Sequence, residues 1–401
     1  MKHIARFFTI YWIIYFPTCI AYNDLPGFSN IDEMMTIVLF LFTLLMCRKR
    51  YINRKPSKEF IVCLGIIAFY FVYSLIWGVN VLGGILLDLM QEVRPYTIIF
   101  CTWILNPQFS RKQKKWMLAM MVLTLVSWII YHPDSIENRS AEFPVLGQLA
   151  ICTGLSWYLL TKQTKRNRNI ALLLVLTGML APKFKFMGEV VCFIAFIYFL
   201  KKRLNFRSPK TILYCTVIAT IVLTVTWTRF DAYYVSGFNN EYLARPMTYK
   251  TSLKILWDYL PFGPGFGTFA CNGAWKFYSP LYYKYNLNDI WGLDEGGGFI
   301  CDAYYPTLAQ FGIVGVFFFL WFWKRRFKEI NVIQDMRYYR VAMITVCCLA
   351  IEQMADSSWL SGKGMGYCML LALCLNANRN MMIERQRQMA ATVSEQAENT
   401  K

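Results

Sequence analysis

The feature that most constrains this chain is a series of apolar stretches separated by short charged segments. The stretches run for roughly 17–20 residues, the length that crosses a bilayer core as a helix. They lack the alternation of a membrane barrel, so helices are the expected spanning element. Only 16% of the 401 residues are charged, and 56% are hydrophobic. We therefore expect an all-α polytopic membrane protein, which excludes a disordered chain, a secreted disulfide scaffold and an ordinary cytosolic enzyme.

The apolar pattern predicts about twelve transmembrane helices within a single membrane domain, 1–401. Segment 1–22 resembles a signal peptide, but Asn23-Asp24-Leu25-Pro26 is a poor cleavage site, so it is interpreted as the first span. The predicted spans lie near 5–22, 34–47, 60–78, 95–106, 116–132, 144–161, 170–182, 188–200, 211–228, 304–323, 341–356 and 364–378.

Basic residues are concentrated in every second connection between these spans. Of the 42 Lys and Arg residues, 31 lie in one alternate set of segments and 11 in the other. Since loops rich in Lys and Arg stay in the cytoplasm, both termini are expected there, including a polar tail at 379–401. The net charge of +18 is then explained by the orientation of the chain in the membrane, and no nucleic-acid partner is expected. The basic set is 1–6, 48–58, 107–115, 162–169, 201–210, 324–340 and 379–401.

Metal ligands and cofactor motifs are scarce in the sequence. The 13 cysteines fall mostly in or beside spans, where Cys acts as a small apolar side chain. Cys271 and Cys301 are the two on the expected outer side, where a disulfide between them is left open. With two histidines and no clustered Cys or His, we expect neither a metal nor a cofactor.

One connection is much longer than the others. Residues 229–300 form an expected extracytoplasmic loop between spans nine and ten. Long loops in compact proteins are usually functional or disordered, and an aromatic-rich one with balanced charges is expected to be folded. Its Tyr and Trp rings, Trp275 among them, suit either a sugar-binding groove or an interfacial aromatic belt.

Two charged positions in this region are candidates for chemistry. Arg245-Pro246 begins an amphipathic stretch, because Pro246 suits the first helical position. The stretch ends before Pro261. A helix start with an Arg favours an anion such as phosphate, although a solvated surface Arg is the alternative. Asp302 stands at the expected outer mouth of span ten, where a carboxylate is costly unless it meets water, a cation or a substrate. Between them, the glycines of 261–267 are read as a tight turn and not as a nucleotide loop.

The order of these motifs resembles the O-antigen ligase and polymerase family. The matching segments are Arg245-x-x-x-Tyr249, the glycine-rich Leu260–Phe269, and Asp302-x-x-Tyr305 through Gln310-x-Gly312-Ile313-Val314-Gly315. The resemblance covers roughly residues 245–315 and implies an integral membrane glycosyltransferase of the bacterial cytoplasmic membrane, with about twelve spans. Ligases tend to carry His-Asn where this chain has Cys301-Asp302, which favours a polymerase.

The same resemblance implies a basic residue just before span eight, a role shared here by Lys183 and Lys185. Either lysine could instead snorkel to the interface. Arg94 is a further outward cation, or an ion-pair partner for Asp88 and Glu92.

The expected reaction joins undecaprenyl-diphosphate-linked oligosaccharide repeats into O-antigen, capsule or exopolysaccharide without a metal. Asp302 and Arg245 are the expected catalytic residues, with Asp294 or Glu295 next in line as base. Lys185, Lys183, Arg94, Tyr249, Tyr305 and Trp275 are the expected substrate-binding residues. Expected partners are the bilayer, a chain-length regulator and a flippase of the same pathway.

Three other functions remain open at this stage. A ligase would transfer the polymer to lipid A core. A polyprenyl-phosphate-sugar glycosyltransferase is suggested by Asp32-Glu33 in the first outer loop, although that loop is short. A flippase or secondary transporter would show internal repeats, which the sequence lacks, and charge within the spans looks sparse, with Glu352 the main exception.

Overall fold

The computed structural model describes the whole chain except residues 1, 25–29, 48–53, 133–144, 181–182 and 384–401. The described part is all-helical and contains no strand. Its α-helices are α1 (Lys2–Asp24), α2 (Ile31–Cys47), α3 (Arg54–Trp77), α4 (Leu82–Leu105), α5 (Arg111–Tyr131), α7 (Val145–Leu160), α8 (Lys165–Leu176), α9 (Phe184–Ile194), α10 (Pro209–Phe230), α11 (Ala244–Asp258), α12 (Asn272–Lys276), α13 (Pro280–Lys284), α14 (Gly312–Asn331), α15 (Met336–Ala355) and α16 (Gly362–Leu375). Short 3₁₀ or π segments are η1 (Thr177–Leu180), η2 (Ala195–Phe199), η3 (Asp231–Val235), η4 (Gly237–Asn239), η5 (Tyr305–Phe311) and η6 (Ser358–Leu360).

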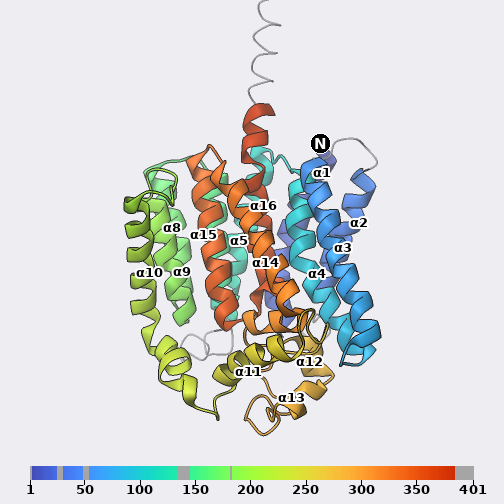
Figure 1. Cartoon of the computed structure of the whole chain (residues 1–401). Coiled ribbons are helices and arrows are strands. Elements are labelled where there is room, and N and C mark those ends of the chain that lie inside the picture. Colours follow the sequence, from blue (N-terminus) through green and yellow to red (C-terminus); the bar gives the residue numbers. More distant parts are fainter. Residues whose placement is uncertain (1, 25–29, 48–53, 133–144, 181–182, 384–401) are drawn as a thin grey trace, which may run out of the picture.

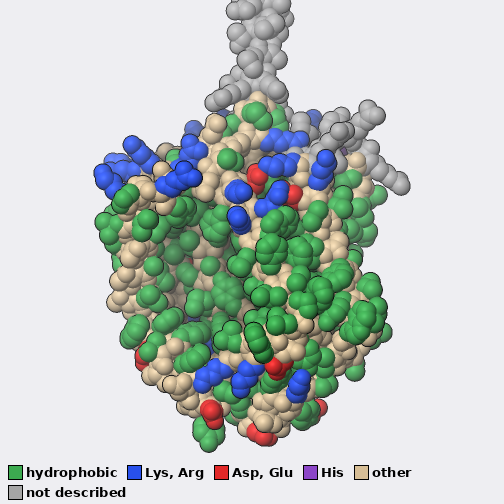
Figure 2. Space-filling view, viewed as in Figure 1, with side chains coloured by type: hydrophobic (Ala, Val, Ile, Leu, Met, Phe, Trp, Pro, Cys, Tyr) green, Lys and Arg blue, Asp and Glu red, His purple; other side chains and the backbone are tan. Residues whose placement is uncertain are grey.

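The long helices stand side by side as one bundle, and α11, α12 and α13 close the end opposite the N-terminus (Figure 1). We name the end that carries α11, α12 and α13 the loop end, and the end that carries the N-terminus the basic end. Lys and Arg side chains gather at the basic end, above a broad apolar band that covers the visible face (Figure 2). This band is the surface expected of helices that face hydrocarbon, because a soluble monomer rarely exposes so large an apolar area.

The interior of the bundle is packed with aromatic and aliphatic side chains. Trp12, Trp128 and Trp359 are each at most 1% exposed, while Ile61 on α3 and Leu213 on α10 are 68% and 65% exposed. None of the residues of α10 is buried. The bundle thus has apolar residues both in its core and on its surface. This pattern is expected for contact with lipid, which favours apolar side chains on the outer surface as well.

Each of the predicted spans overlaps a helical segment of the described chain, although several differ in their bounds. Among the described residues, five helical segments are long and apolar enough to cross a membrane, and two shorter apolar helices accompany them. The described part of the chain therefore has the structure of a helical membrane protein. The count of twelve crossings stays a prediction.

The predicted fourth span began too late. We expected a start near residue 95, whereas α4 begins at Leu82 and runs through Asp88, Glu92 and Arg94. These charges suggested a loop, but each is at most 3% exposed and has a partner inside the bundle. Tertiary contacts therefore offset the cost of burying polar groups that hydropathy alone penalises.

The predicted tenth span was also wrong in detail. The 3₁₀ segment η5 comes first, and the regular helix α14 begins at Gly312, where φ is 60°. The segment preceding it holds α11, α12 and α13. Its assignment as an extracytoplasmic loop stays a prediction. α10 continues past Arg229 into η3, so the predicted loop begins inside a helix.

The glycine-rich turn after α11 packs tightly on α4 and η5. The Gly267 N–H and the Gln310 Nε2 both donate to the Asp88 carboxylate, at 2.8 and 2.7 Å. A Cβ at Gly267, where φ is 73°, would lie 2.5 Å from the Gly84 carbonyl oxygen, so only glycine fits. The turn joins the loop end to the bundle and holds η5, which follows Asp302.

Candidate functional site

The candidate site begins with an ion pair between two distant segments. α11 carries Arg245 in its first turn, and Asp302 lies three residues before η5. Arg245 Nη2 donates to Asp302 Oδ2, although 57 positions separate them. The guanidinium also lies over the Tyr233 ring, 4.4 Å from its centroid. A cation–π contact and an ion pair together fix the planar guanidinium at the loop end of the bundle.

The helix around Arg245 begins two residues before Pro246, which the sequence placed at the first helical position. α11 starts at Ala244, with Pro246 in its first turn, and ends before Pro261. Leu243 precedes it and provides no side-chain cap. The first N–H groups of α11 therefore lack the side-chain partner that a Ser or Asp would supply.

A second group of charges lies beside the first pair. Lys185, in the first turn of α9, donates from Nζ to Glu352 Oε2 and to Asp356 Oδ2, at 2.6 Å each. Lys363 Nζ lies 3.7 Å from the same Asp356 oxygen. Lys183 occupies the position before α9. Three helices thus bring charged side chains together at the loop end.

The two groups interact electrostatically. Burial raises the pKa of Asp302, Arg245 opposes the rise, and both Lys185 and Asp356 act on the same carboxyl. Burial and the neighbouring Lys185 lower the pKa of Lys183, which also feels Asp302. We therefore treat these residues as one unit, the polar cluster: Arg245, Asp302, Lys183, Lys185, Glu352, Asp356 and Lys363.

The acids of the cluster differ in their protonation chemistry. Burial also acts to raise the pKa of Asp356, but Lys185 and Lys363 outweigh it and hold the pKa well below the usual range. Asp302 has a raised pKa, although Arg245 touches it. Between these two carboxyls, Asp302 is the better proton acceptor, because a base of higher pKa binds a proton more strongly.

Two predicted substrate residues are part of the frame around the cluster. The Tyr249 hydroxyl donates to the Met354 carbonyl at 2.9 Å, and Tyr234 donates to the same oxygen at 2.7 Å. Tyr305 donates to the Ala350 carbonyl at 3.2 Å. These bonds tie α11, η3 and η5 to the final turns of α15, so they hold Arg245 and Asp302 in place.

Arg94 lies away from the cluster, in the interior. It is 1% exposed and pairs with Asp32 Oδ2 at 2.6 Å, with Glu33, and with the Leu360 carbonyl oxygen. The expectation of Asp88 and Glu92 as its partners was wrong. The start of α2 packs beside α4 and brings two carboxylates to Arg94, which leaves it buried and not open to a ligand.

Trp275 is placed on another part of the loop end. It is 42% exposed on α12, which packs on the start of α4 through Gly273 and Gly84. Asp294 Oδ1 accepts from the Gly292 N–H at 2.8 Å and so stabilises a turn. The next acid, Glu295, is exposed.

Cys271 and Cys301 are both free thiols, and Cys301 Sγ lies 3.0 Å from Asn272 Oδ1. In the described part of the chain, no three His, Cys, Asp or Glu side chains group closely enough to hold a metal ion.

Sequence reasoning missed Asp356, Lys363 and the aromatic contact from Tyr233. Asp356 directly follows α15, and Lys363 is the second residue of α16, so both lie next to the short connection between these helices, on the side predicted to be outer. The uneven distribution of Lys and Arg among the connections could have pointed to Lys363, because the outer side carries few basic residues and Lys363 is one of them.

No protein-family model matches the chain, and no curated protein matches it.

Proposed function

We propose that this chain is a polymerase that joins polyprenyl-diphosphate-linked oligosaccharide repeats at the outer face of the bacterial cytoplasmic membrane, with both termini in the cytoplasm. The single observation behind the proposal is the polar cluster at the loop end of an apolar bundle. A lipid-linked diphosphate would lie at that boundary between hydrocarbon and water. The cluster there has four cations against three carboxylates, and this excess of positive charge suits an anionic ligand.

Support for the diphosphate comes from the arrangement of the cations. Arg245 presents a planar fork that can bind two oxygens, and the uncapped first turn of α11 adds N–H donors. Lys185 and Lys363 carry point charges beside it. These groups would stabilise the charge that develops on the departing diphosphate.

The step transfers the growing chain to a new hydroxyl. The acceptor hydroxyl oxygen attacks the anomeric carbon of the donor sugar and forms a C–O bond. The bond between that carbon and the phosphate oxygen breaks, and the polyprenyl diphosphate leaves with the electron pair. Asp302 takes the hydroxyl proton and later releases it to water, which its 26% exposed side chain can reach.

The resting ion pair suggests how substrate binding prepares the base. Arg245 holds Asp302 before substrate arrives. An incoming diphosphate competes for the guanidinium and frees the carboxylate next to the acceptor. Loss of that contact removes an effect that lowers the pKa of Asp302, so the carboxylate becomes a stronger base.

The lipid-facing surface offers a route for the carrier tail. Figure 2 shows a hollow in the apolar band between α10 and α14, and α11 crosses the loop end below it in Figure 1. A polyprenyl chain in this hollow would place its diphosphate near Arg245. A chain-length regulator and a flippase of the same pathway are the partners that such a reaction implies.

A second candidate is translocation of the lipid-linked oligosaccharide. It is favoured by charges inside the bundle, which are more numerous than the sequence suggested. Glu189 is fully buried, contacts Glu352 and accepts from the Tyr367 hydroxyl at 3.3 Å. Ionisable residues at membrane depth are functional candidates by default.

Reconstitution separates these functions. The purified full chain is mixed with a polyprenyl-diphosphate-linked repeat in proteoliposomes, and products are resolved by gel. A ladder of longer glycolipids, absent with Asp302→Asn, supports the polymerase. An unaltered glycolipid that changes leaflet contradicts the polymerase and supports the transporter. Deletion in the host distinguishes the ligase, which would leave lipid-linked polymer accumulated but unattached.

A further inference from the structure

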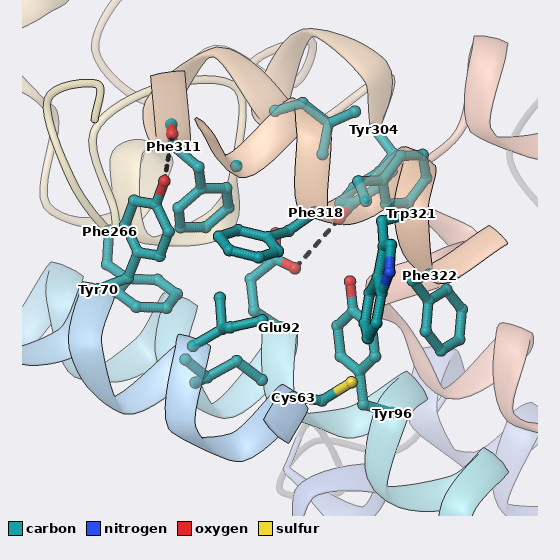
Figure 3. Close-up of a pocket in the computed structure, with 15 residues that line it drawn as sticks. Cys63, Tyr70, Glu92, Tyr96, Phe266, Tyr304, Phe311, Phe318, Trp321 and Phe322 are labelled. Atoms are coloured by element: carbon teal, nitrogen blue, oxygen red, sulfur yellow. Dashed lines mark hydrogen bonds between the residues drawn. The ribbon is translucent and has the colours of Figure 1, made fainter. Parts of the chain in front are cut away.

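Two cavities follow one another along the seam between α3 and α14. The first, near the basic end, is about 240 Å³ and is lined by Lys55, Lys324, Arg325, Lys328, Glu329 and Trp321. The second continues from Trp321 toward the loop end and is mainly apolar, although Glu92, which accepts from the Tyr304 hydroxyl at 3.1 Å, also lines it (Figure 3). Trp321 lines both of them, so the two cavities share one wall.

The first cavity carries an excess of positive charge. Glu329 pairs with Lys55 at 2.6 Å, and Arg325 Nη2 lies 3.5 Å from Glu59 while its guanidinium stacks on the Trp321 ring. Lys324 and Lys328 are exposed and form no ion pair with any described residue. Both lysines project beside a cavity several times larger than the roughly 30 Å³ that one water occupies. The cavity therefore suits an anionic group larger than water.

The second cavity is a crevice with aromatic walls. Tyr70, Tyr96, Phe318 and Trp321 lie along it, and Figure 3 shows their rings around a common space. Its enclosed part is about 70 Å³, room for a few methylene groups of one chain. Ile66 and Ile67 on the α3 side are only partly buried, so the crevice adjoins the lipid-facing surface.

The crevice extends along α14 from the Trp321 junction. Its lining on this helix runs from Gly315 to Phe322, about 10 Å at 1.5 Å per residue. Half of a bilayer core is about 15 Å thick, so the crevice accommodates only part of one acyl chain. A basic cavity at the interface, followed by a mainly apolar crevice within the bundle, has the outline of a phospholipid with its headgroup at the basic end.

We propose that the α3–α14 seam binds one anionic phospholipid of the leaflet at the basic end, with its phosphate at Lys324 and Lys328 and part of one acyl chain in the crevice. Basic pockets between transmembrane helices recognise anionic headgroups by charge. The Trp321 ring lies at the junction, where an indole suits the glycerol region. This site lies at the opposite end from the polar cluster and does not depend on the reaction proposed there.

Native mass spectrometry of the delipidated full chain tests the site. Palmitoyl-oleoyl phosphatidylglycerol is added, and phosphatidylcholine with the same chains serves as the reference lipid. We expect one phosphatidylglycerol to be retained at least tenfold more strongly than phosphatidylcholine. Equal retention of the two lipids would overturn the proposal, because charge would then play no part.

Matched variants locate the contact. Lys324→Gln with Lys328→Gln should remove the preference, while Arg111→Gln with Lys112→Gln, exposed at the start of α5, should keep it. Both variants lose the same charge, and circular dichroism checks that both remain helical. If the α5 variant loses the preference equally, or if the seam variant keeps it, the seam is not the site.

Two further probes separate a lipid from a free phosphate. Inorganic phosphate at millimolar concentration should leave phosphatidylglycerol bound, and dihexanoyl phosphatidylglycerol should bind at least tenfold more weakly than the long-chain lipid. Displacement by inorganic phosphate, or equal binding of the short-chain lipid, would assign the basic cavity to a soluble anion and refute the role of the crevice.

Discussion

Arg245 and Asp302 form an ion pair across 57 residues of sequence, at the end of a bundle whose outer surface is apolar. Arg245 lies at the start of α11, and Asp302 lies just before η5, which the glycine-rich turn holds against α4. The pair is partly open, with side chains 15% and 26% exposed. It is thus accessible to a ligand, unlike the Arg94 pairs in the interior.

Replacement of Arg245 by Lys should lower kcat/KM for polymerisation by about 10–100-fold. The change keeps the charge but loses the planar fork, and a charged hydrogen bond contributes about 1.5–3 kcal/mol. Initial rates in proteoliposomes measure it. The control Lys284→Arg alters another cation of the loop end and should have wild-type rates. A wild-type rate for Arg245→Lys would remove Arg245 from the reaction.

Asp302→Asn should reduce turnover by about 10²–10⁴-fold, the usual contribution of a general base. Donor binding should persist, because the cations remain. A donor-binding assay alongside the rate assay separates the two effects. A near wild-type rate would show that Asp302 is not the base, and Glu295 or Asp294 would be tested next.

The rate should depend on the ionisation of Asp302. Only the ionised carboxylate accepts a proton, and burial raises its pKa above the ordinary value of 3.8. Activity should therefore be constant at high pH and fall as pH decreases through a midpoint above 3.8. Rates at saturating donor across a pH series measure the midpoint. A midpoint at or below the ordinary value would contradict the assignment.

Lys185→Met should destabilise the protein by about 3–5 kcal/mol, because it leaves the buried Glu352 and Asp356 carboxylates without their closest cation. Thermal unfolding in detergent measures the loss. Lys363→Met removes only a 3.7 Å contact and should cost less. The double variant Lys185→Met/Asp356→Asn should recover part of the stability, whereas a simple sum of two losses would show that the pair is not coupled.

Asp356 should contribute to acid sensitivity. Its pKa is lower in the folded chain than in the unfolded chain, so its stabilising contribution is present above the ordinary pKa of 3.8 and is lost as pH falls below it. Asp356→Asn should therefore flatten the acid limb of the unfolding curve, and an unchanged limb would contradict the ion pair.

Labelling of single cysteines in a cysteine-light background tests the predicted orientation. A cysteine at position 275, where the native Trp is 42% exposed, should react with an impermeant reagent from outside the cell. A cysteine at Gln163, in a predicted cytoplasmic connection, should react only after permeabilisation. The reverse pattern would overturn the predicted orientation and the proposed function.

Polymer formation should persist in EDTA. In the proposed reaction, the positive charge that stabilises the departing diphosphate comes from the side chains of Arg245, Lys185 and Lys363 and not from an exchangeable metal ion. The ladder assay with and without chelator measures this. Loss of activity that a divalent cation restores would point to a carboxylate metal site.

The sequence by itself determined the helical character, the start of α11 and the candidates Arg245 and Asp302. These features follow from local physics: long apolar runs favour helices in lipid, and Pro fits the first turn of a helix. The bounds of α4 could not be read this way, because its charges are hidden by partners from other segments.

Only the tertiary structure decided which charges meet. Lys185 pairs with Asp356, 171 positions away in the sequence, and Asp88 accepts a hydrogen bond from the Gly267 N–H, 179 positions away. Arg94 pairs with Asp32 and Glu33, and not with the acids of its own helix. Hydropathy and propensity act over a few turns, whereas an ion pair depends on which helices become neighbours and at what height, which packing of the whole bundle sets.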